Sequence, residues 1–392
     1  MRALFVWVVL LGCRGLDLTP PALEVRGPVG PVRTMAEFTI KVADGETAVR
    51  RLVATVDGER PIVVPLPEGP SPLELGWVLG LRSLSHGRHL VAFTAFDDAL
   101  VANQTVAEVP VEVDRVPAAL ELHAPTLVAG QGRTASIWVR GKDERLGEAT
   151  LVLGDEREPM FPVDGAFRAL RGVPIRETPG VLPFTILAED RAGNPSRVEG
   201  ELRIVATEFE EGGLIKLTPK QTKARRNVEA MTTMRKERDD TYKLRTLEQA
   251  WEGPFGLPVG NGRLTSRFGR FRTYSDGRRD HHTGMDLAKQ EGADIYAAAD
   301  GRVVLAKPQA VFGNVVILDH GHGVTSSYNH LLSIAVEVGQ QVEKGDVIAA
   351  LGSTGQSTAP HLHWSMVVGD HPVDPDEWLA NDFSTSPFER GK

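Results

Sequence analysis

Short apolar runs rich in β-branched residues, broken every few positions by glycine or proline, constrain the fold of this chain more than any other feature. In the first part of the chain, Glu37–Val42, Arg51–Val56 and His89–Thr94 each have the length and composition of a β-strand. Asp57-Gly58 is a dipeptide typical of the tight turn that follows such a strand. With 40 Gly and 26 Pro among 392 residues, the sequence predicts a mostly β chain of two or three domains.

The strand pattern occurs twice, over residues 22–115 and again over 116–206. Ala188–Asn194 resembles the sequence that ends a strand in bacterial Ig-like modules, and Ala95–Ala99 is its rough counterpart in the first copy. We therefore expect two Ig-like β-sandwiches, with one larger β domain as the alternative. Neither copy holds a His, Asp, Glu or Cys cluster with metal-ligand spacing, so both are interpreted as spacers or as recognition modules for wall or envelope proteins.

The N-terminus has the pattern of an export signal. Arg2 precedes an apolar run, residues 3–11, that is too short to cross a bilayer, and the run ends at Gly12-Cys13. Residues 10–13 resemble the lipobox of bacterial lipoproteins, which implies that Cys13 is acylated after removal of residues 1–12. The alternative is a plain signal peptide with an incidental cysteine. We expect an exported protein tethered through residues 13–21 to the membrane of a bacterial envelope, on its periplasmic side.

The distribution of charge along the chain is informative in two ways. A net charge of −8 gives no electrostatic support for binding nucleic acid. Between Lys216 and Arg245, however, ten Lys and Arg residues accompany four Asp and Glu. This composition predicts a charged, helical linker over residues 207–250. Because this long charged connector directly precedes the next domain, we hypothesise that residues 214–250 or the second sandwich partly cover a groove there.

Two pairs of spaced residues in the last third of the chain, one His–Asp and one His–His, predict a metal site. His282 and Asp286 lie four residues apart, so in an extended chain they share a face, while Met285 and Leu287 face the core and Gly284 leaves room. His361 and His363 repeat with the same strand period. Two imidazoles and one carboxylate, from His282, Asp286 and His363, would be the three-ligand set of a catalytic zinc site. Each pair alone is a weak signal.

Taken together and in order, the motifs resemble the lysostaphin/LytM-type zinc endopeptidases. The resemblance covers residues 251–378 and is carried by the segments Leu264–Gly269, His282–Asp286, Ala297–Val303, Gly313–Gly321, Tyr328–Leu331, Val338–Gly345, Gly352–Gly355 and Pro360–His363. It implies a small antiparallel β domain, the duplicated hybrid motif, over residues 251–380, followed by a tail at 381–392. One departure is Trp364-Ser365-Met366, where the family often has an acidic residue that supports the site.

Carried over by position, the resemblance implies Zn²⁺ ligands at His282, Asp286 and His363, and two further active-site histidines at His330 and His361. Either His330 or His361 would act as general base, a choice that the sequence leaves open. His281, His320 and His322 are expected to be surface or supporting residues and not ligands. All five positions of the family pattern are filled, whereas regulatory members typically lose ligands.

The function implied is a zinc-dependent endopeptidase that hydrolyses peptide cross-links between the stem peptides of bacterial peptidoglycan. The alternative is a catalytically silent scaffold that binds the wall and activates a separate amidase.

Overall fold

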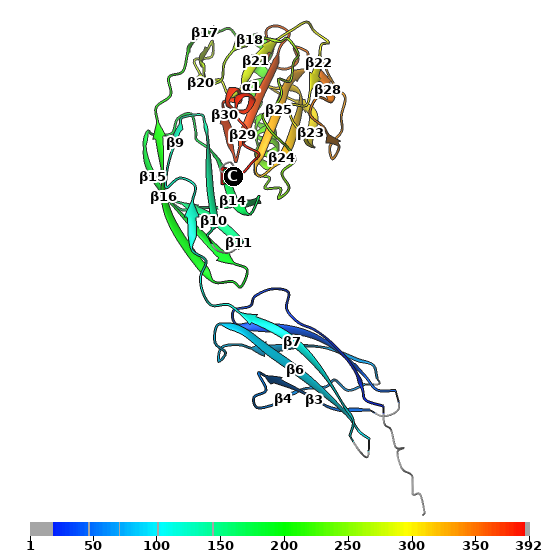
Figure 1. Cartoon of the computed structure of the whole chain (residues 1–392). Coiled ribbons are helices and arrows are strands. Elements are labelled where there is room, and N and C mark those ends of the chain that lie inside the picture. The colour runs from blue at the N-terminus through cyan, green and yellow to red at the C-terminus, as the bar shows by residue number, and fades with distance from the viewer. Residues whose placement is uncertain (1–18, 46–47, 70, 100–101, 143–144, 389–392) are drawn as a thin grey trace, which may run out of the picture. The chain divides into compact units, whose positions relative to one another are not determined.

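The computed structural model describes residues 19–45, 48–69, 71–99, 102–142 and 145–388, which form mostly antiparallel sheets and a few short helices (Figure 1). The mostly β fold class predicted from the sequence is confirmed. The predicted leader and Cys13 lie outside the described residues. Within the described part, no helix is both long and apolar enough to span a bilayer. Contacts divide the chain into two compact units, residues up to 118 with 189–196, and residues 119–188 with 197 onward.

The first β region contains two antiparallel sheets. One has the order β1-β2-β5 and the other β4-β3-β6-β7, formed by β1 (Ala22–Arg26), β2 (Met35–Ala43), β3 (Val49–Val56), β4 (Ile62–Val64), β5 (Leu73–Gly80), β6 (Gly87–Asp97) and β7 (Gln104–Val113). Alternate residues of β2 are buried, and Phe38 of β2 packs edge-on against Phe93 of β6 with ring centroids 5.0 Å apart. The core therefore lies between the sheets. Asp57 and Gly58 have φ of 50° and 75°, as the predicted turn requires.

The second β region also contains two sheets. Their orders are β13-β14-β10-β8 and β12-β11-β15-β16-β9, formed by β8 (Leu120–Leu122), β9 (Thr126–Gly130), β10 (Thr134–Gly141), β11 (Leu146–Leu153), β12 (Glu156–Pro159), β13 (Phe161–Val163), β14 (Ala166–Gly172), β15 (Gly180–Asp190) and β16 (Pro195–Val205). Ile137 of the first sheet and Ile186 of the second are completely buried. The Ig-like character of both regions and the domain boundaries stay predictions.

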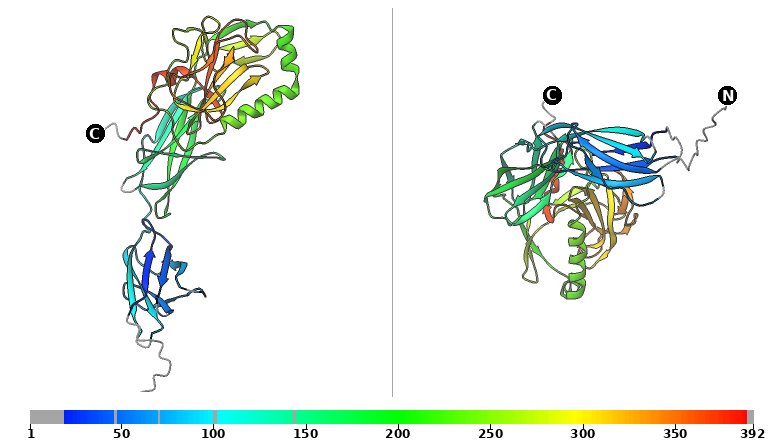
Figure 2. Two further views of the ribbon diagram at one scale, coloured as in Figure 1. Left: turned by 90° about the vertical axis from the view of Figure 1, so that its right-hand side faces the viewer. Right: turned by 90° about the horizontal axis from the view of Figure 1, so that it is seen from below.

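Residues 207–250, the connecting segment between the second β region and the C-terminal domain, contain a strand as well as helices. Strand β17 (Glu211–Ile215) pairs in parallel with β19 (Phe271–Tyr274), which pairs with β20 (Arg279–His281). Helix α1 (Pro219–Arg226) begins at a capping box formed by Thr218 and Gln221, and α2 (Val228–Tyr242) follows it. Figure 2 shows these helices against the outside of the C-terminal sheet. They are held there by Arg238, which is buried and donates to Ser327 Oγ at 3.0 Å and to Asn329 Oδ1 at 3.2 Å.

The C-terminal domain is built on one large antiparallel sheet. Its order is β18-β21-β29-β25-β24-β23-β27 with β30 paired to β29, from β18 (Arg263–Ser266), β21 (Met285–Ala288), β23 (Gly301–Gln309), β24 (Gly313–Gly321), β25 (Val324–Leu331), β27 (Gln341–Val342), β29 (Leu362–Val368) and β30 (His371–Val373). A small second sheet contains β22 (Asp294–Tyr296), β26 (Ser333–Ile334) and β28 (Val347–Ala350), and α3 (Pro375–Ala380) follows. Trp364, Tyr328 and Leu318 are fully buried in its core.

Candidate metal centre and active site

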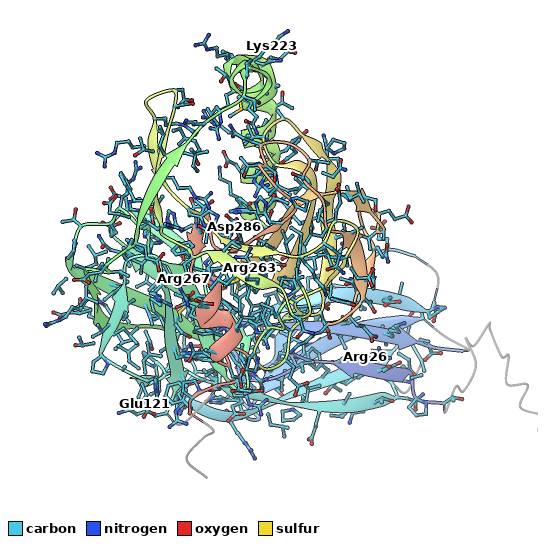
Figure 3. The ribbon with its side chains drawn as sticks, turned by 90° about the horizontal axis from the view of Figure 1, so that it is seen from above. Arg26, Glu121, Lys223, Arg263, Arg267 and Asp286 are labelled. Carbon is cyan, nitrogen blue, oxygen red and sulfur yellow. The ribbon has the colours of Figure 1, made fainter. Side chains whose placement is uncertain are left out.

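Three ligand-type side chains converge in the C-terminal domain. Asp286 of β21 lies opposite His363 of β29 in the strand register, and His282 follows directly after β20. His282 Nε2, Asp286 Oδ1 and His363 Nδ1 form a triangle with sides of 2.8, 2.9 and 2.9 Å. All three residues are buried. In the view of Figure 3, Asp286 lies near the middle of the molecule and Lys223 of α1 at its edge. The three buried residues are those that the sequence pairs singled out.

His282 reaches the centre by a route that differs from the expectation. Thr283 and Gly284 lie outside any strand, so His282 and Asp286 do not share the face of one extended segment. The space beside Gly284 is also filled, by atoms of Trp364 and Ser365 of β29. A Cβ atom at this position would lie 2.3 Å from Trp364 O and 2.6 Å from Ser365 Oγ. Gly284 therefore lets the ligand loop approach the backbone of β29.

Replacing Gly284 by alanine is expected to push the His282 loop away from β29. Because the nearest atom is backbone, the clash cannot be relieved by a side-chain rotation, and we expect a loss of about 2 kcal/mol in the free energy of unfolding together with weaker metal binding. Urea unfolding and zinc titration measure both effects. The control is Gly260→Ala, where a Cβ meets no atom within 4 Å. Equal behaviour of the two variants would contradict this role of Gly284.

Hydrogen bonds fix the orientation of the three side chains. His282 Nδ1 donates to Arg267 O at 2.9 Å, so Nε2 of the neutral ring carries a lone pair. Arg272 donates to Asp286 Oδ2 at 2.5 Å and to Ser266 Oγ at 2.9 Å, which leaves Asp286 Oδ1 facing the imidazoles. His363 Nε2 lies 3.0 Å from Ser365 Oγ. Ser365 thus contacts a ligand from the segment where the family often has an acidic residue. Arg272 and Ser266 also support the ligands, and the sequence analysis did not predict them.

This donor set fits a divalent cation. A carboxylate oxygen and the Nε2 lone pair of His282 would repel at 2.9 Å unless a proton or a metal ion lies between them. Two imidazole nitrogens with one carboxylate oxygen, supported by further hydrogen bonds, are a ligand set that suits zinc. The residues present therefore fit a Zn²⁺ ion.

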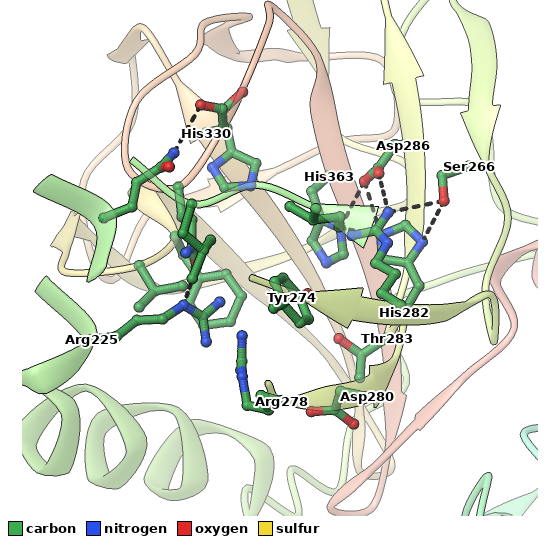
Figure 4. Close-up of a pocket in the computed structure, with 18 of the residues that line it drawn as sticks. Arg225, Ser266, Tyr274, Arg278, Asp280, His282, Thr283, Asp286, His330 and His363 are labelled. Atoms are coloured by element: carbon green, nitrogen blue, oxygen red, sulfur yellow. Dashed lines mark hydrogen bonds and ion pairs between the residues drawn. The ribbon is translucent and has the colours of Figure 1, made fainter. Parts of the chain in front are cut away.

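Two further histidines line the same pocket. His330, at the end of β25 with φ of 64°, donates from Nδ1 to Thr354 O at 2.8 Å, and His361 donates from Nδ1 to Ala359 O at 2.8 Å. Their rings are 5.0 Å apart. With Nδ1 donating to a carbonyl, Nε2 is the nitrogen that carries the lone pair whenever either ring is neutral, and Nε2 of His361 lies 3.7 Å from Asp286 Oδ1. The structure thus brings all five predicted site residues to one pocket. Figure 4 shows His282, Asp286, His330 and His363 in it.

Burial lowers the pKa of three histidines of this pocket, His282, His330 and His363, and keeps them neutral. It lowers the pKa of His330 to about 4, with a further contribution from His361, and the pKa of His363 to about 3. Burial alone would raise the pKa of Asp286, but the close polar contacts with His282 and His363 outweigh it and hold that pKa well below its usual value. At neutral pH the imidazoles are uncharged and the carboxylate is ionised, which are the forms that bind a metal ion.

The pocket is about 890 Å³ in volume, large enough for several residues of a peptide. One wall carries the five site residues. The opposite wall is formed by the connecting segment, through residues of β17, α1 and α2, and by the β19–β20 hairpin. The predicted linker therefore does lie at a groove of the following domain.

His320 and His322 are buried, which corrects the expectation that they lie at the surface or support the site. His320 Nδ1 donates to Asp300 O at 2.6 Å, and its Nε2 lies 2.8 Å from Ser326 Oγ. His322 stacks on Phe161 of the second β region with ring centroids 4.4 Å apart. The burial of these two histidines could not be predicted from their Gly-flanked sequence, because the residues that cover them come from distant segments. His281, by contrast, is half-buried and donates to Gly269 O.

His320 makes the stability of the protein sensitive to acid. Burial lowers its pKa to about 4, below the unfolded value of 6.5, so the unfolded chain takes up a proton first as the pH falls. Its contribution is complete above pH 6.5 and is lost between pH 6.5 and 4, by roughly 3 kcal/mol in total. Urea unfolding at several pH values should show a shallower decline for His320→Gln than for the wild type. Parallel declines would contradict the assignment.

Comparison with known proteins identifies the class of the C-terminal domain. Residues 280–375 match the model of Peptidase family M23. Peptidoglycan DD-endopeptidase ShyB of Vibrio cholerae is 38% identical over 112 residues, which cover 28% of this chain and 26% of that protein. Murein hydrolase activator EnvC of Escherichia coli is 39% identical over 97 residues, which cover 25% of this chain and 23% of that protein. The aligned part is thus about a quarter of the length of these relatives.

A solved peptidase M23 protein from Pseudomonas aeruginosa is 23% identical, with a TM-score of 0.47, and the match covers 66% of this chain and 96% of that one. The C-terminal domain of this chain is an M23 peptidase domain of the LytM type. Its relatives include peptidoglycan endopeptidases, and the resemblance read from the sequence is confirmed for this domain.

Proposed function

We propose that this protein is a zinc-dependent endopeptidase that hydrolyses peptide cross-links in bacterial peptidoglycan. The observation that carries the proposal is the buried triangle of His282, Asp286 and His363 with His330 and His361 on the same pocket. The names of relatives such as ShyB point to the same substrate. A second candidate, a catalytically silent activator, has support from the likeness to EnvC, but the complete ligand set and the two additional histidines favour catalysis.

In this proposal each site residue has a defined task. His282, Asp286 and His363 would hold the zinc ion, which when bound would supply a Lewis acid for the scissile carbonyl and lower the pKa of water toward about 7. Arg272 fixes the carboxylate of Asp286 through Oδ2. His330 and His361, each anchored through Nδ1, present Nε2 as a proton acceptor. The one that takes up the proton then becomes a cation able to stabilise the developing oxyanion.

Purified peptidoglycan separates the two candidate functions. The full chain, zinc and peptidoglycan are incubated with no other protein, and the products are analysed by mass spectrometry. An endopeptidase removes cross-linked dimers and yields monomers whose masses identify the bond that is cut. An activator leaves the dimers intact until an amidase is added, and that result would replace the first candidate by the second.

The N-terminal half of the chain would position the enzyme. We propose that the protein is exported, that residue Cys13 carries the lipid anchor, and that the two β regions act as Ig-like spacers between membrane and wall. The apolar run that ends at Cys13 supports the anchor, and the wall-directed relatives support the location. Replacing Cys13 by serine should move the protein from the membrane fraction to the soluble fraction. Retention in the membrane fraction would argue against this anchor.

A further inference from the structure

The pocket in front of the metal centre is basic, although the chain as a whole is acidic. Among the described residues that line it, seven are Lys or Arg and three are Asp, whereas the chain contains 44 basic and 52 acidic residues. Two of the three carboxylates are already engaged. Asp286 belongs to the metal centre, and Asp280 accepts from Arg176 Nη2 at 3.1 Å and from His281 N at 3.0 Å. The pocket therefore attracts anions.

Two of the arginines come together on one aromatic ring. The guanidinium carbons of Arg225, at the end of α1, and Arg278, in the β19–β20 turn, lie 5.2 and 4.1 Å from the centre of the Tyr274 ring. Figure 4 shows both side chains in the pocket beside Tyr274. Burial lowers the pKa of Arg225, and the charge of Arg278 lowers it further, although Asp276 and Asp280 partly offset this. An anion placed here would relieve the repulsion between two cations.

The same wall holds buried donors without an acceptor. Nε and Nη2 of Arg278 and Nε2 of Gln356 are buried and have no hydrogen-bond partner among the described residues. Gln356 Oε1 accepts from Arg225 Nε at 2.5 Å, which turns the amide nitrogen of Gln356 away from that contact. A guanidinium and an amide NH₂ can only donate, so the group that satisfies them must be an acceptor. A carboxylate matches paired guanidinium donors in shape and charge.

We propose that Arg225, Arg278 and Gln356 form a subsite for a carboxylate of the peptide whose scissile bond lies at the metal centre. The inference rests on the proposed endopeptidase function and narrows its substrate class. The preferred substrates are cross-linked stem peptides with free carboxylates next to the cleaved bond, and peptides in which those carboxylates are amidated are poor substrates. The two cationic members of the subsite, Arg225 and Arg278, lie outside residues 280–375, the part that matches the family model, and Gln356 lies inside it.

The test compares synthetic cross-linked stem-peptide dimers with free carboxylates and the same dimers with carboxamides. Wild-type kcat/KM should be about 10- to 100-fold higher for the free form, the range expected for hydrogen bonds to a charged group. Arg278→Gln and Arg225→Gln should each remove most of this preference, by lowering kcat/KM for the free form much more than for the amidated form. Urea unfolding of each variant verifies that it folds. The matched control is Arg279→Gln, because Arg279 lies next to Arg278 but packs on Phe271 at 4.5 Å, outside the pocket.

Binding of the uncross-linked stem peptide, measured by calorimetry, tests the carboxylate subsite independently of whether the protein is a hydrolase. The full chain should bind the free peptide more tightly than the amidated one, and Arg278→Gln should abolish the difference. If no dimer is cut but this binding preference is present, the hydrolase proposal fails and the subsite stands. Equal kcat/KM and equal affinity for free and amidated peptides would overturn the subsite. A loss of preference in Arg279→Gln as large as in Arg278→Gln would overturn it too.

Discussion

Replacing His363 by alanine is expected to abolish both stoichiometric zinc binding and cross-link cleavage. His363 supplies one corner of the 2.8–2.9 Å triangle, and a two-ligand remainder cannot hold the ion at micromolar zinc. We expect a loss in kcat/KM on the order of 1000-fold or more. Zinc content after dialysis and the rate of dimer cleavage measure the two effects. His361→Ala should differ, with normal zinc content but a rate that falls about 100-fold.

The matched control is His281→Ala. His281 is adjacent to His282 in sequence, but its Nδ1 donates to Gly269 O and its ring packs on Phe271 with centroids 5.0 Å apart. This variant should retain one zinc ion per chain and most of the activity. Retention of zinc by His363→Ala, or loss of zinc in His281→Ala alone, would show that the ligand set is wrong.

Arg168→Ala is expected to cause the largest loss of stability. Arg168 of β14 is completely buried and donates to Gln249 Oε1 at 2.8 Å, to Phe383 O, and to His322 Nδ1 at 2.6 Å. Alanine would leave these acceptors unsatisfied and a cavity between the second β region and the C-terminal domain. Together these effects should lower the free energy of unfolding by about 3–5 kcal/mol.

Urea unfolding of the full chain tests this prediction. The control is Arg157→Ala on β12 of the same region, because Arg157 is exposed and its loss should change stability by less than about 0.5 kcal/mol. A loss below 1 kcal/mol in Arg168→Ala would mean that the buried guanidinium contributes little and that the second β region is attached mainly by other contacts.

Asp286 and His363 of the metal centre could be predicted because strand periodicity is local, whereas His282 lies outside any strand and was placed by the family resemblance. His361 and His363 alternate around Leu362, and Asp286 lies between Met285 and Leu287, so the pattern of apolar residues already places the ligands on the opposite face. The supporting residues could not be found in this way. Arg272 reaches Asp286 from β19, and Ser266 reaches the site from β18, so the contacts depend on which strands are neighbours.

In the fold, too, features set by neighbouring residues could be predicted, whereas features set by residues far apart in sequence could not. The turn at Asp57-Gly58 and the helices of the connecting segment follow from propensity and capping residues near in sequence. Strand β17 was not predicted, because Glu211–Ile215 contains two glycines and becomes a strand only by pairing with β19. Burial of His320 and His322 likewise depends on segments that the sequence does not place beside them.

The most direct test of the zinc centre is a titration of the metal-free full chain with Zn²⁺ while the cleavage of purified cross-linked peptidoglycan is followed. The expected result is no cleavage without metal and a linear rise in cleavage that ends at one zinc ion per chain, with no response in His363→Ala. Cleavage by the metal-free protein, or full binding of one zinc ion without any cleavage, would contradict it.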